Sequence, residues 1–104
     1  MWNLNNKTVV ISGATNGIGK AASIELSKEN PKILFTYRNQ SLADELLTEI
    51  KDVSPNTRVQ PVYCDFSDQN SIKKCANEIN DLCTSIDVLI NNAGVVNTSY
   101  HETA

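Results

Sequence analysis

The sequence predicts an α/β fold, a parallel β-sheet flanked by helices, from two observations. Four short apolar or β-branched runs alternate with three segments of helical periodicity, which is the signature of repeated strand–helix–strand units. The runs are residues 8–11, 32–36, 58–62 and 87–90. Three of them are continuously apolar or β-branched, as is typical of strands buried on both faces of a parallel sheet.

The three segments between these runs have apolar residues at the spacing of an amphipathic helix. The stripes expected to face inward are Ile18, Ala21, Ala22 and Leu26 in the first segment, Leu42, Leu46, Leu47 and Ile50 in the second, and Ile72, Cys75, Ala76, Ile79, Leu82 and Cys83 in the third. Asn30 and Pro31 mark the end of the first helix. Ser41 is expected to cap the second helix and Ser67 or Asp68 the third, because a side-chain oxygen there can accept from the free N–H groups.

The third run differs from the others because it alternates polar and apolar residues and contains Pro61. Proline cannot donate to a sheet ladder and is therefore confined to strand starts, bulges and edge strands. In a doubly wound sheet of strand order 3-2-1-4, the third strand lies at the edge. The four runs and three helices therefore predict the N-terminal part of a Rossmann doubly wound parallel sheet in this order.

Size, charge and cysteine count exclude several classes of protein. The 104 residues suffice for one domain, residues 1–104, and the net charge of −3 argues against nucleic acid as a partner. No apolar stretch approaches the roughly 20 residues of a membrane-spanning helix. Residues 1–6 lack the features of a signal peptide, so a cytoplasmic location is expected. Three cysteines without a Cys-x-x-Cys pair, and a single histidine, predict buried free thiols and no metal site.

A glycine-rich turn follows the first run directly, over residues 12–19. Gly13 permits a tight turn, Gly17 lets a pyrophosphate approach the backbone, and Gly19 lets the next helix pack closely on the strand. The N–H groups and the positive end of the helix dipole would then face the phosphates. Glycines also cluster in loops without a ligand, but the position between a strand and a helix favours phosphate binding.

Three motifs, in the right order, resemble those of the short-chain dehydrogenase/reductase family. Residues 13–19 (Gly-Ala-Thr-Asn-Gly-Ile-Gly) resemble its cofactor turn, residues 64–68 (Cys-Asp-Phe-Ser-Asp) its segment after the third strand, and residues 91–94 (Asn-Asn-Ala-Gly) its motif after the fourth. The resemblance covers essentially the whole chain. Gly-Ile-Gly-Lys and the last five residues are most similar to the retinol-dehydrogenase-like branch, whose members act on retinoids, other lipids and assorted, xenobiotic-like carbonyl compounds.

The end of the second run bears on the choice between NADH and NADPH. An acidic side chain there would accept hydrogen bonds from the ribose hydroxyls and repel a 2′-phosphate. The chain has Arg38 and no acid over residues 35–39, and a guanidinium suits a phosphate. An arginine at this place is typical of the family's NADP(H)-dependent members, so NADP(H) is expected over NAD(H). Lys20 and Asn16 are expected to add support near the phosphates.

The resemblance implies a nicotinamide dinucleotide site at the carboxyl ends of the strands, where ligands bind in open α/β sheets. Asp65 would accept a hydrogen bond from the adenine amino group, with Phe66 supplying backbone there. Asn91, Ala93 and Gly94 would line the adenine-ribose side of the cleft. The expected cofactor-binding residues are Gly13, Thr15, Asn16, Gly17, Ile18, Gly19, Arg38, Asp65, Phe66, Asn91, Ala93 and Gly94.

The family's catalytic pair, a tyrosine with a lysine four residues later, is absent from the sequence. The three tyrosines Tyr37, Tyr63 and Tyr100 are followed at that spacing by Ser41, Ser67 and Ala104. No catalytic residue is assigned, and the chain is expected to be truncated before the catalytic segment. Loss of the next strand is expected to leave residues 88–90 at an open edge, with marginal stability and self-association.

Two functions from different classes stay open. The first is the NADP(H)-binding part of a short-chain dehydrogenase whose complete form transfers hydride between NADPH and a carbonyl or alcohol. The second is a non-catalytic, truncated isoform that holds a dinucleotide or pairs with another subunit. A nucleotide-sugar epimerase or a methyltransferase on a similar sheet is disfavoured by the Asn-Asn-Ala-Gly motif together with the glycine spacing.

Overall fold

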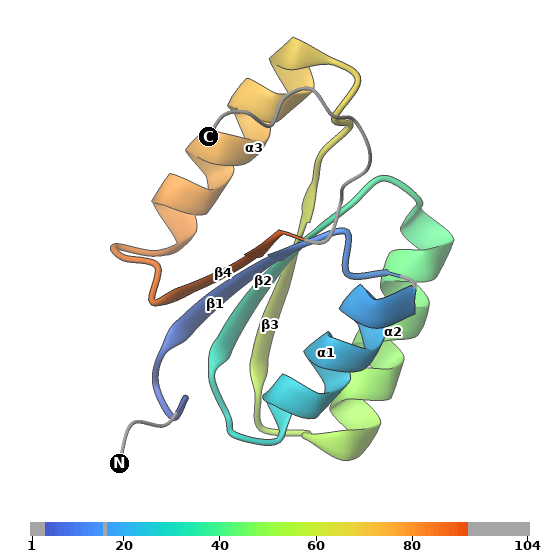
Figure 1. The fold of residues 1–104 in the computed structure, drawn as a ribbon, viewed down its shortest axis with the longest axis vertical. Coiled ribbons are helices and arrows are strands. Elements are labelled where there is room, and N and C mark those ends of the chain that lie inside the picture. The colour runs from blue at the N-terminus through green and yellow to red at the C-terminus, as the bar shows by residue number, and fades with distance from the viewer. Residues whose placement is uncertain (1–3, 16, 92–104) are drawn as a thin grey trace.

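A computed structural model of the chain describes residues 4–15 and 17–91 (Figure 1). Within these residues four strands alternate with three helices. The strands are β1 (Thr8–Ser12), β2 (Lys32–Tyr37), β3 (Arg58–Tyr63) and β4 (Val88–Asn91), and the helices are α1 (Gly17–Ser27), α2 (Gln40–Val53) and α3 (Gln69–Leu82). Every strand bound lies within one residue of the predicted run.

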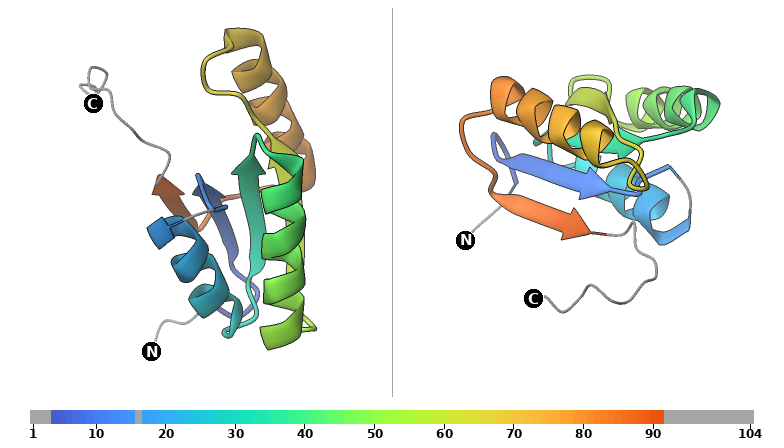
Figure 2. Two further views of the ribbon diagram at one scale, coloured as in Figure 1. Left: turned by 90° about the vertical axis from the view of Figure 1, so that its right-hand side faces the viewer. Right: turned by 90° about the horizontal axis from the view of Figure 1, so that it is seen from above.

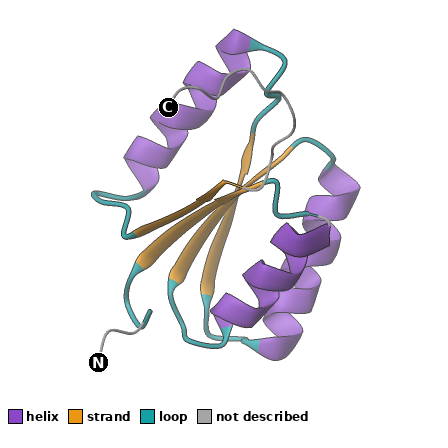
Figure 3. Ribbon diagram, viewed as in Figure 1, coloured by secondary structure: helices purple, strands orange, loops and turns teal. Residues whose placement is uncertain are grey.

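The four strands form one parallel sheet in the order β3-β2-β1-β4, which confirms the predicted topology. Pro61 lies on the edge strand β3, as its missing N–H requires. Because all strands run the same way, their carboxyl ends lie at one edge of the sheet. The strands are orange in Figure 3, and their arrows point the same way in the left view of Figure 2. No helix in the described part of the chain is long and apolar enough to cross a membrane.

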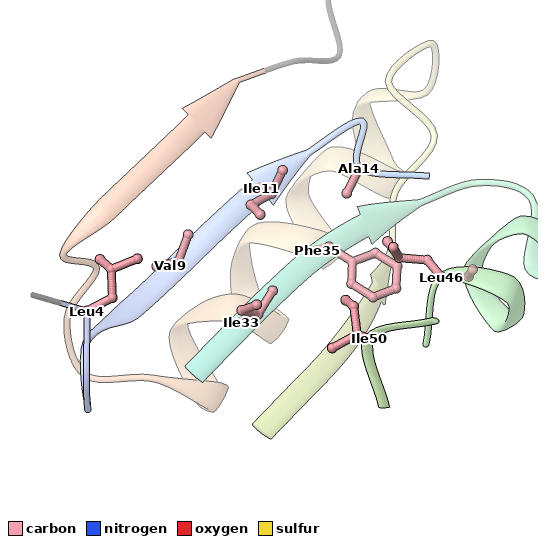
Figure 4. Close-up of a cluster of buried hydrophobic side chains, with 9 residues drawn as sticks. Leu4, Val9, Ile11, Ala14, Ile33, Phe35, Leu46 and Ile50 are labelled. Atoms are coloured by element: carbon pink, nitrogen blue, oxygen red, sulfur yellow. The ribbon is translucent and has the colours of Figure 1, made fainter. Parts of the chain in front are cut away.

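The two faces of the sheet are covered by different helices. Seen from above in Figure 2, α3 lies on one side of β1 and α1 on the other. The larger core lies between the central strands and the layer formed by α1 and α2. Figure 4 shows its side chains on β1, β2 and α2. Its buried members are Leu4, Val9, Ile11, Ala14, Ile33, Phe35, Ala43, Leu46 and Ile50. Because fully burying a Val, Leu, Ile or Phe side chain contributes about 1.5–3 kcal/mol, this cluster is the main source of stability.

The opposite face carries a smaller core beneath α3. Val62, Cys64 and Cys75 are buried there, with Ile79 and Leu82 packed beside them. Other parts of the predicted α3 stripe are more open than expected, since Ile72 is 38% exposed and Ala76 faces solvent. Leu89 of β4 is 66% exposed, because α3 packs on β3 at the other edge of the sheet.

The inner face of α1 differs from the predicted apolar stripe. Gly19, Ser23 and Ser27 are buried, whereas Ile18 is 80% exposed and Ala21 also faces solvent. Ser23 Oγ donates to the Gly19 carbonyl oxygen (2.7 Å), and Ser27 Oγ donates to a carbonyl oxygen of the same helix (2.6 Å). These hydroxyls are satisfied inside the helix, so small serines can occupy the buried face that packs on α2. A pattern of hydropathy cannot detect such a face.

The helix caps confirm one prediction and correct another. Asn39 caps α2 in place of the expected Ser41: its Oδ1 accepts from the N–H of Leu42 (3.1 Å). The backbone of Asn39 is extended (φ −99°, ψ 114°), as a capping residue requires, whereas Ser41 already lies in the helix. Asp68 caps α3 as predicted, accepting from the N–H of Asn70 (2.9 Å).

Leu46→Ala should lower the free energy of unfolding by about 2–5 kcal/mol, because it leaves a cavity in the fully buried cluster around Phe35. Thr48→Ala, on the exposed side of the same helix, is the matched control and should change it by less than about 0.5 kcal/mol. Urea unfolding followed by circular dichroism measures both. Equal effects of the two substitutions would show that this cluster does not hold the fold together.

Candidate functional site

The turn between β1 and α1 has the backbone that its glycines predict. Gly13 and Gly17 have positive φ angles of 68° and 59°, a conformation that residues with a Cβ disfavour. A Cβ placed on Gly17 would meet no atom within 4 Å, so the backbone there is open to approach from outside. Gly19 is buried in the first turn of α1. The turn thus leaves room for a ligand at the N-terminus of a helix, where anions are favoured.

Side-chain hydrogen bonds hold this turn between its two neighbouring strands. Ser12 Oγ, at the end of β1, donates to Asn91 Oδ1, at the end of β4 (2.8 Å). The N–H of Gly13 donates to Thr36 Oγ1 on β2 (3.4 Å). The sequence does not single out Ser12 and Thr36, because a hydroxyl at the end of an apolar strand has no distinctive pattern. In the sequence, Ser12 is indicated only by its place directly before the glycine turn, and Thr36 is not indicated at all.

Arg38 and Asp65 come together across the ends of β2 and β3. Arg38 Nη1 lies 3.8 Å from Asp65 Oδ1, and the two side chains are 69% and 26% exposed. Tyr37, just before Arg38, and Tyr63, two residues before Asp65, are paired in register, and their rings meet edge to face with centroids 5.7 Å apart. An exposed pair at this distance contributes little to stability. Little is therefore lost if Arg38 turns to another anion.

The carboxylate of Asp65 is held in one orientation. Its Oδ1 accepts from the hydroxyl of Ser67 (2.7 Å) and from the N–H of Ser67 (3.0 Å), and Arg38 approaches the same oxygen. These hydrogen bonds, together with the arginine charge, lower the pKa of Asp65 below its ordinary value. Near neutral pH the carboxylate of Asp65 is therefore ionised and can only accept hydrogen bonds. Its Oδ2 has no partner among the described residues.

The other predicted cofactor residues are exposed or half-buried, or they lie outside the described residues. Phe66, next to Asp65, is 52% exposed, and Ile18 in the first turn of α1 is 80% exposed. Thr15 is half-buried in the glycine turn. The predicted residues outside the described ranges are Asn16, Ala93 and Gly94.

Lys20, in the first turn of α1, forms an ion pair with α2. Its Nζ lies 2.7 Å from Glu49 Oε2 on α2. Hydrogen bonding to Glu49 raises the pKa of Lys20 above its ordinary value. Lys20 therefore links the two helices on this face of the sheet. The sequence does not indicate this contact, because the two residues are far apart along the chain.

The thiols near the site belong to the core, as predicted. Cys64 and Cys75 are buried and form no disulfide, and they pack together beneath α3. Burial raises the pKa of Cys64, and burial with a hydrogen bond to Cys64 raises the pKa of Cys75 to about 12. Since the thiolate is the reactive form, both are poor nucleophiles. Among the described residues, no group of His, Cys, Asp and Glu could hold a metal ion.

Iodoacetamide at mildly alkaline pH should therefore modify Cys83 first in the folded protein, because Cys83 is only half-buried. Cys64 and Cys75 should react only as the chain unfolds, because burial keeps them protonated and inaccessible. Peptide mass mapping measures the order, and the same reaction in urea, where all three should react alike, is the control. Fast modification of Cys64 in the folded chain would contradict its place in the core.

Comparisons with known proteins bear on this site. The family model of the short chain dehydrogenases matches residues 7–104. Uncharacterized oxidoreductase YxbG of Bacillus subtilis is 37% identical over 95 residues, which are 91% of this chain and 34% of that protein. Human retinol dehydrogenase 13 is 32% identical over 90 residues, 86% of this chain and 27% of that protein. The crystal structure of YwfH, an NADPH-dependent reductase involved in bacilysin biosynthesis, has a TM-score of 0.79 at 29% identity, covering 86% of this chain and 35% of that one.

The matched proteins are much longer than this chain, which spans 34% of the first relative and 27% of the second. The matched part of this chain includes all four strands, the glycine turn and the Arg38–Asp65 pair. The similarity therefore covers the carboxyl edge of the sheet described above.

Proposed function

The chain belongs to the short-chain dehydrogenase/reductase family, and from this membership we propose that it binds NADP(H) across the carboxyl edge of its sheet. The observation that carries the proposal is the glycine turn, in which Gly13 and Gly17 have positive φ and the backbone at Gly17 is open. The pyrophosphate lies over this turn, where the N–H groups and the dipole of α1 favour negative charge. Nicotinamide dinucleotides are the cofactors of the family.

The adenosine half of the cofactor extends from the turn toward the ends of β2 and β3. Arg38 receives the 2′-phosphate, since its guanidinium is exposed, only weakly paired, and has no acidic neighbour on its own strand end. Asp65 accepts from the adenine amino group through the carboxylate oxygen that has no protein partner. Asn91 and the following Ala93 and Gly94 line the adenine-ribose side. The NADPH dependence of the similar protein YwfH supports this choice of cofactor.

The complete protein transfers hydride between NADPH and a carbonyl or alcohol of retinoid, lipid or xenobiotic type. Support for this substrate class comes from the similarity to retinol dehydrogenase 13. The present sequence has no tyrosine followed four residues later by lysine. Since that pair donates the proton to the carbonyl in this family, residues 1–104 would supply the cofactor site and not the proton donor.

A second candidate is a non-catalytic module that holds a dinucleotide or pairs with another subunit. The strand β4 favours it, because β4 is an outer strand of the described sheet and its Leu89 is 66% exposed. An open edge strand is a template for pairing with another chain.

Titration of the purified chain with NADPH and with NADH, followed by ligand fluorescence, tests the first proposal. Arg38→Ala should weaken NADPH binding by about 10–100-fold, the range for losing a hydrogen bond to a charged group, because only NADPH carries the 2′-phosphate. NADH binding should stay within about twofold. Arg58→Ala, which removes the same charge at the amino end of β3, is the control and should change neither.

Two results would count against this function. Absence of NADPH binding by the unmodified chain at millimolar concentration would contradict both the cofactor-binding part of a dehydrogenase and the dinucleotide-holding module. Equal weakening of NADPH and NADH by Arg38→Ala would show that the arginine does not read the 2′-phosphate.

Self-association through β4 is tested by sedimentation velocity over a range of protein concentrations. The unmodified chain should form dimers or larger species as concentration rises. Leu89→Lys should suppress them, because it removes a 66% exposed apolar side chain from the edge strand and adds a charge there. Val53→Lys replaces another exposed apolar side chain (45%) by a charged one at the end of α2, and it should not suppress these species. A monomer at all concentrations would contradict the pairing module.

A further inference from the structure

We propose that Ser71 and Ser67 are positioning residues that determine which base the site accepts, because they hold Asp65 with one carboxylate oxygen turned to the ligand. The inference rests on the proposed dinucleotide function and adds base discrimination to it. Ser71 lies outside the three motifs at residues 13–19, 64–68 and 91–94. Neither serine is placed to touch the reacting end of a cofactor, since both act through Asp65.

The backbone of Asp65 is fixed from two sides. Ser71 Oγ, in the first turn of α3, accepts from the N–H of Asp65 (2.8 Å), and Ser71 is only 7% exposed. The carbonyl oxygen of Asp65 accepts from the N–H of Asp68, the residue that caps the same helix (3.0 Å). The segment after β3 is therefore attached to α3 at both polar groups of this residue. A short hydrogen bond at a buried position restricts the backbone more than an exposed one does.

The side chain of Asp65 is fixed separately, by Ser67. Both Ser67 contacts go to Oδ1, and the Arg38 guanidinium lies nearest the same oxygen. Oδ2 is left as an acceptor without a protein partner among residues 4–15 and 17–91. An ionised carboxylate oxygen that points outward attracts an amino group and repels a carbonyl oxygen.

This chemistry separates two purines that have nearly the same shape. Adenine carries an exocyclic amino group, which donates to Oδ2. Hypoxanthine carries a carbonyl oxygen at the same position. This oxygen is partially negative and can only accept hydrogen bonds, so the carboxylate repels it. A base is thus distinguished only while Asp65 keeps its orientation, and the orientation depends on Ser71 through the backbone and on Ser67 through the side chain.

The test compares the dissociation constants of NADPH and of reduced nicotinamide hypoxanthine dinucleotide phosphate, using the full chain. The unmodified chain should prefer NADPH by about tenfold or more, the factor expected for one hydrogen bond to a charged acceptor. Ser71→Ala should reduce this ratio by about threefold or more, whereas Ser71→Thr, which keeps the hydroxyl, should retain it. Ser54→Ala is the matched control, since Ser54 is 6% exposed, hydrogen-bonded to Ser27 and remote from the site.

If Ser71 had a purely structural role, Ser71→Ala would weaken the binding of both dinucleotides equally and leave the ratio unchanged, which would overturn the inference.

Hydrogen exchange gives a second readout without ligand: the amides of residues 65–68 should exchange faster in Ser71→Ala and not in Ser54→Ala. If Ser71→Ala does not fold, Ser67→Ala at an exposed position takes its place; it should lower the same ratio and raise the pKa of Asp65. Failure of the unmodified chain to bind NADPH overturns the proposed function and this inference together, whereas NADPH binding with an unaltered ratio overturns this inference alone.

Discussion

The parallel pairing of β1 with β2 on one side and with β4 on the other is the constraint on which the rest of the structure depends. Val9 and Ile11 are fully buried against the α1–α2 layer, and Val10 is buried on the opposite face. A slip of one residue would turn Thr8 and Ser12 toward the larger core in place of Val9 and Ile11, so packing fixes the register. The register in turn brings the ends of all four strands to one edge, and every candidate site residue described lies along that edge.

Apolar burial and polar contacts contribute differently to this edge. The apolar side chains of β1 and β2 determine where the strands end, but they do not orient the groups that follow. Three hydroxyls do so: Ser12 contacts Asn91, Thr36 contacts the backbone of Gly13, and Ser71 contacts the backbone of Asp65. The first two bonds join strands that are far apart in the chain, and the third joins the end of β3 to the start of α3. Because the carboxyl edge of the sheet is partly buried, loss of one of these contacts would leave a polar group without a partner. It would also let the group that the hydroxyl orients move out of position.

The two outer strands of the sheet are protected to different extents. β3 carries Pro61 and alternating polar residues, which weaken it as a template for another strand. β4 is a short strand with Leu89 exposed and no such feature among its four residues. In the described sheet, the edge formed by β4 is therefore the less protected of the two. The site lies next to this edge, since Asn91 ends β4 and is bonded to Ser12 at the start of the glycine turn.

The sequence by itself determined the number, type and order of the elements, the strand order and the place of the glycine turn. These follow from local periodicity, from a proline that excludes a central strand and from glycines whose positive φ is a property of single residues. Only the tertiary structure decided which face of α1 is buried, that Lys20 pairs with Glu49, and which serines hold Asp65. The physical reason is that a hydroxyl or an ammonium group is defined by its partner, and apart from the nearby Ser67 these partners lie on other segments. Their proximity exists only once burial of the central strands has brought those segments together.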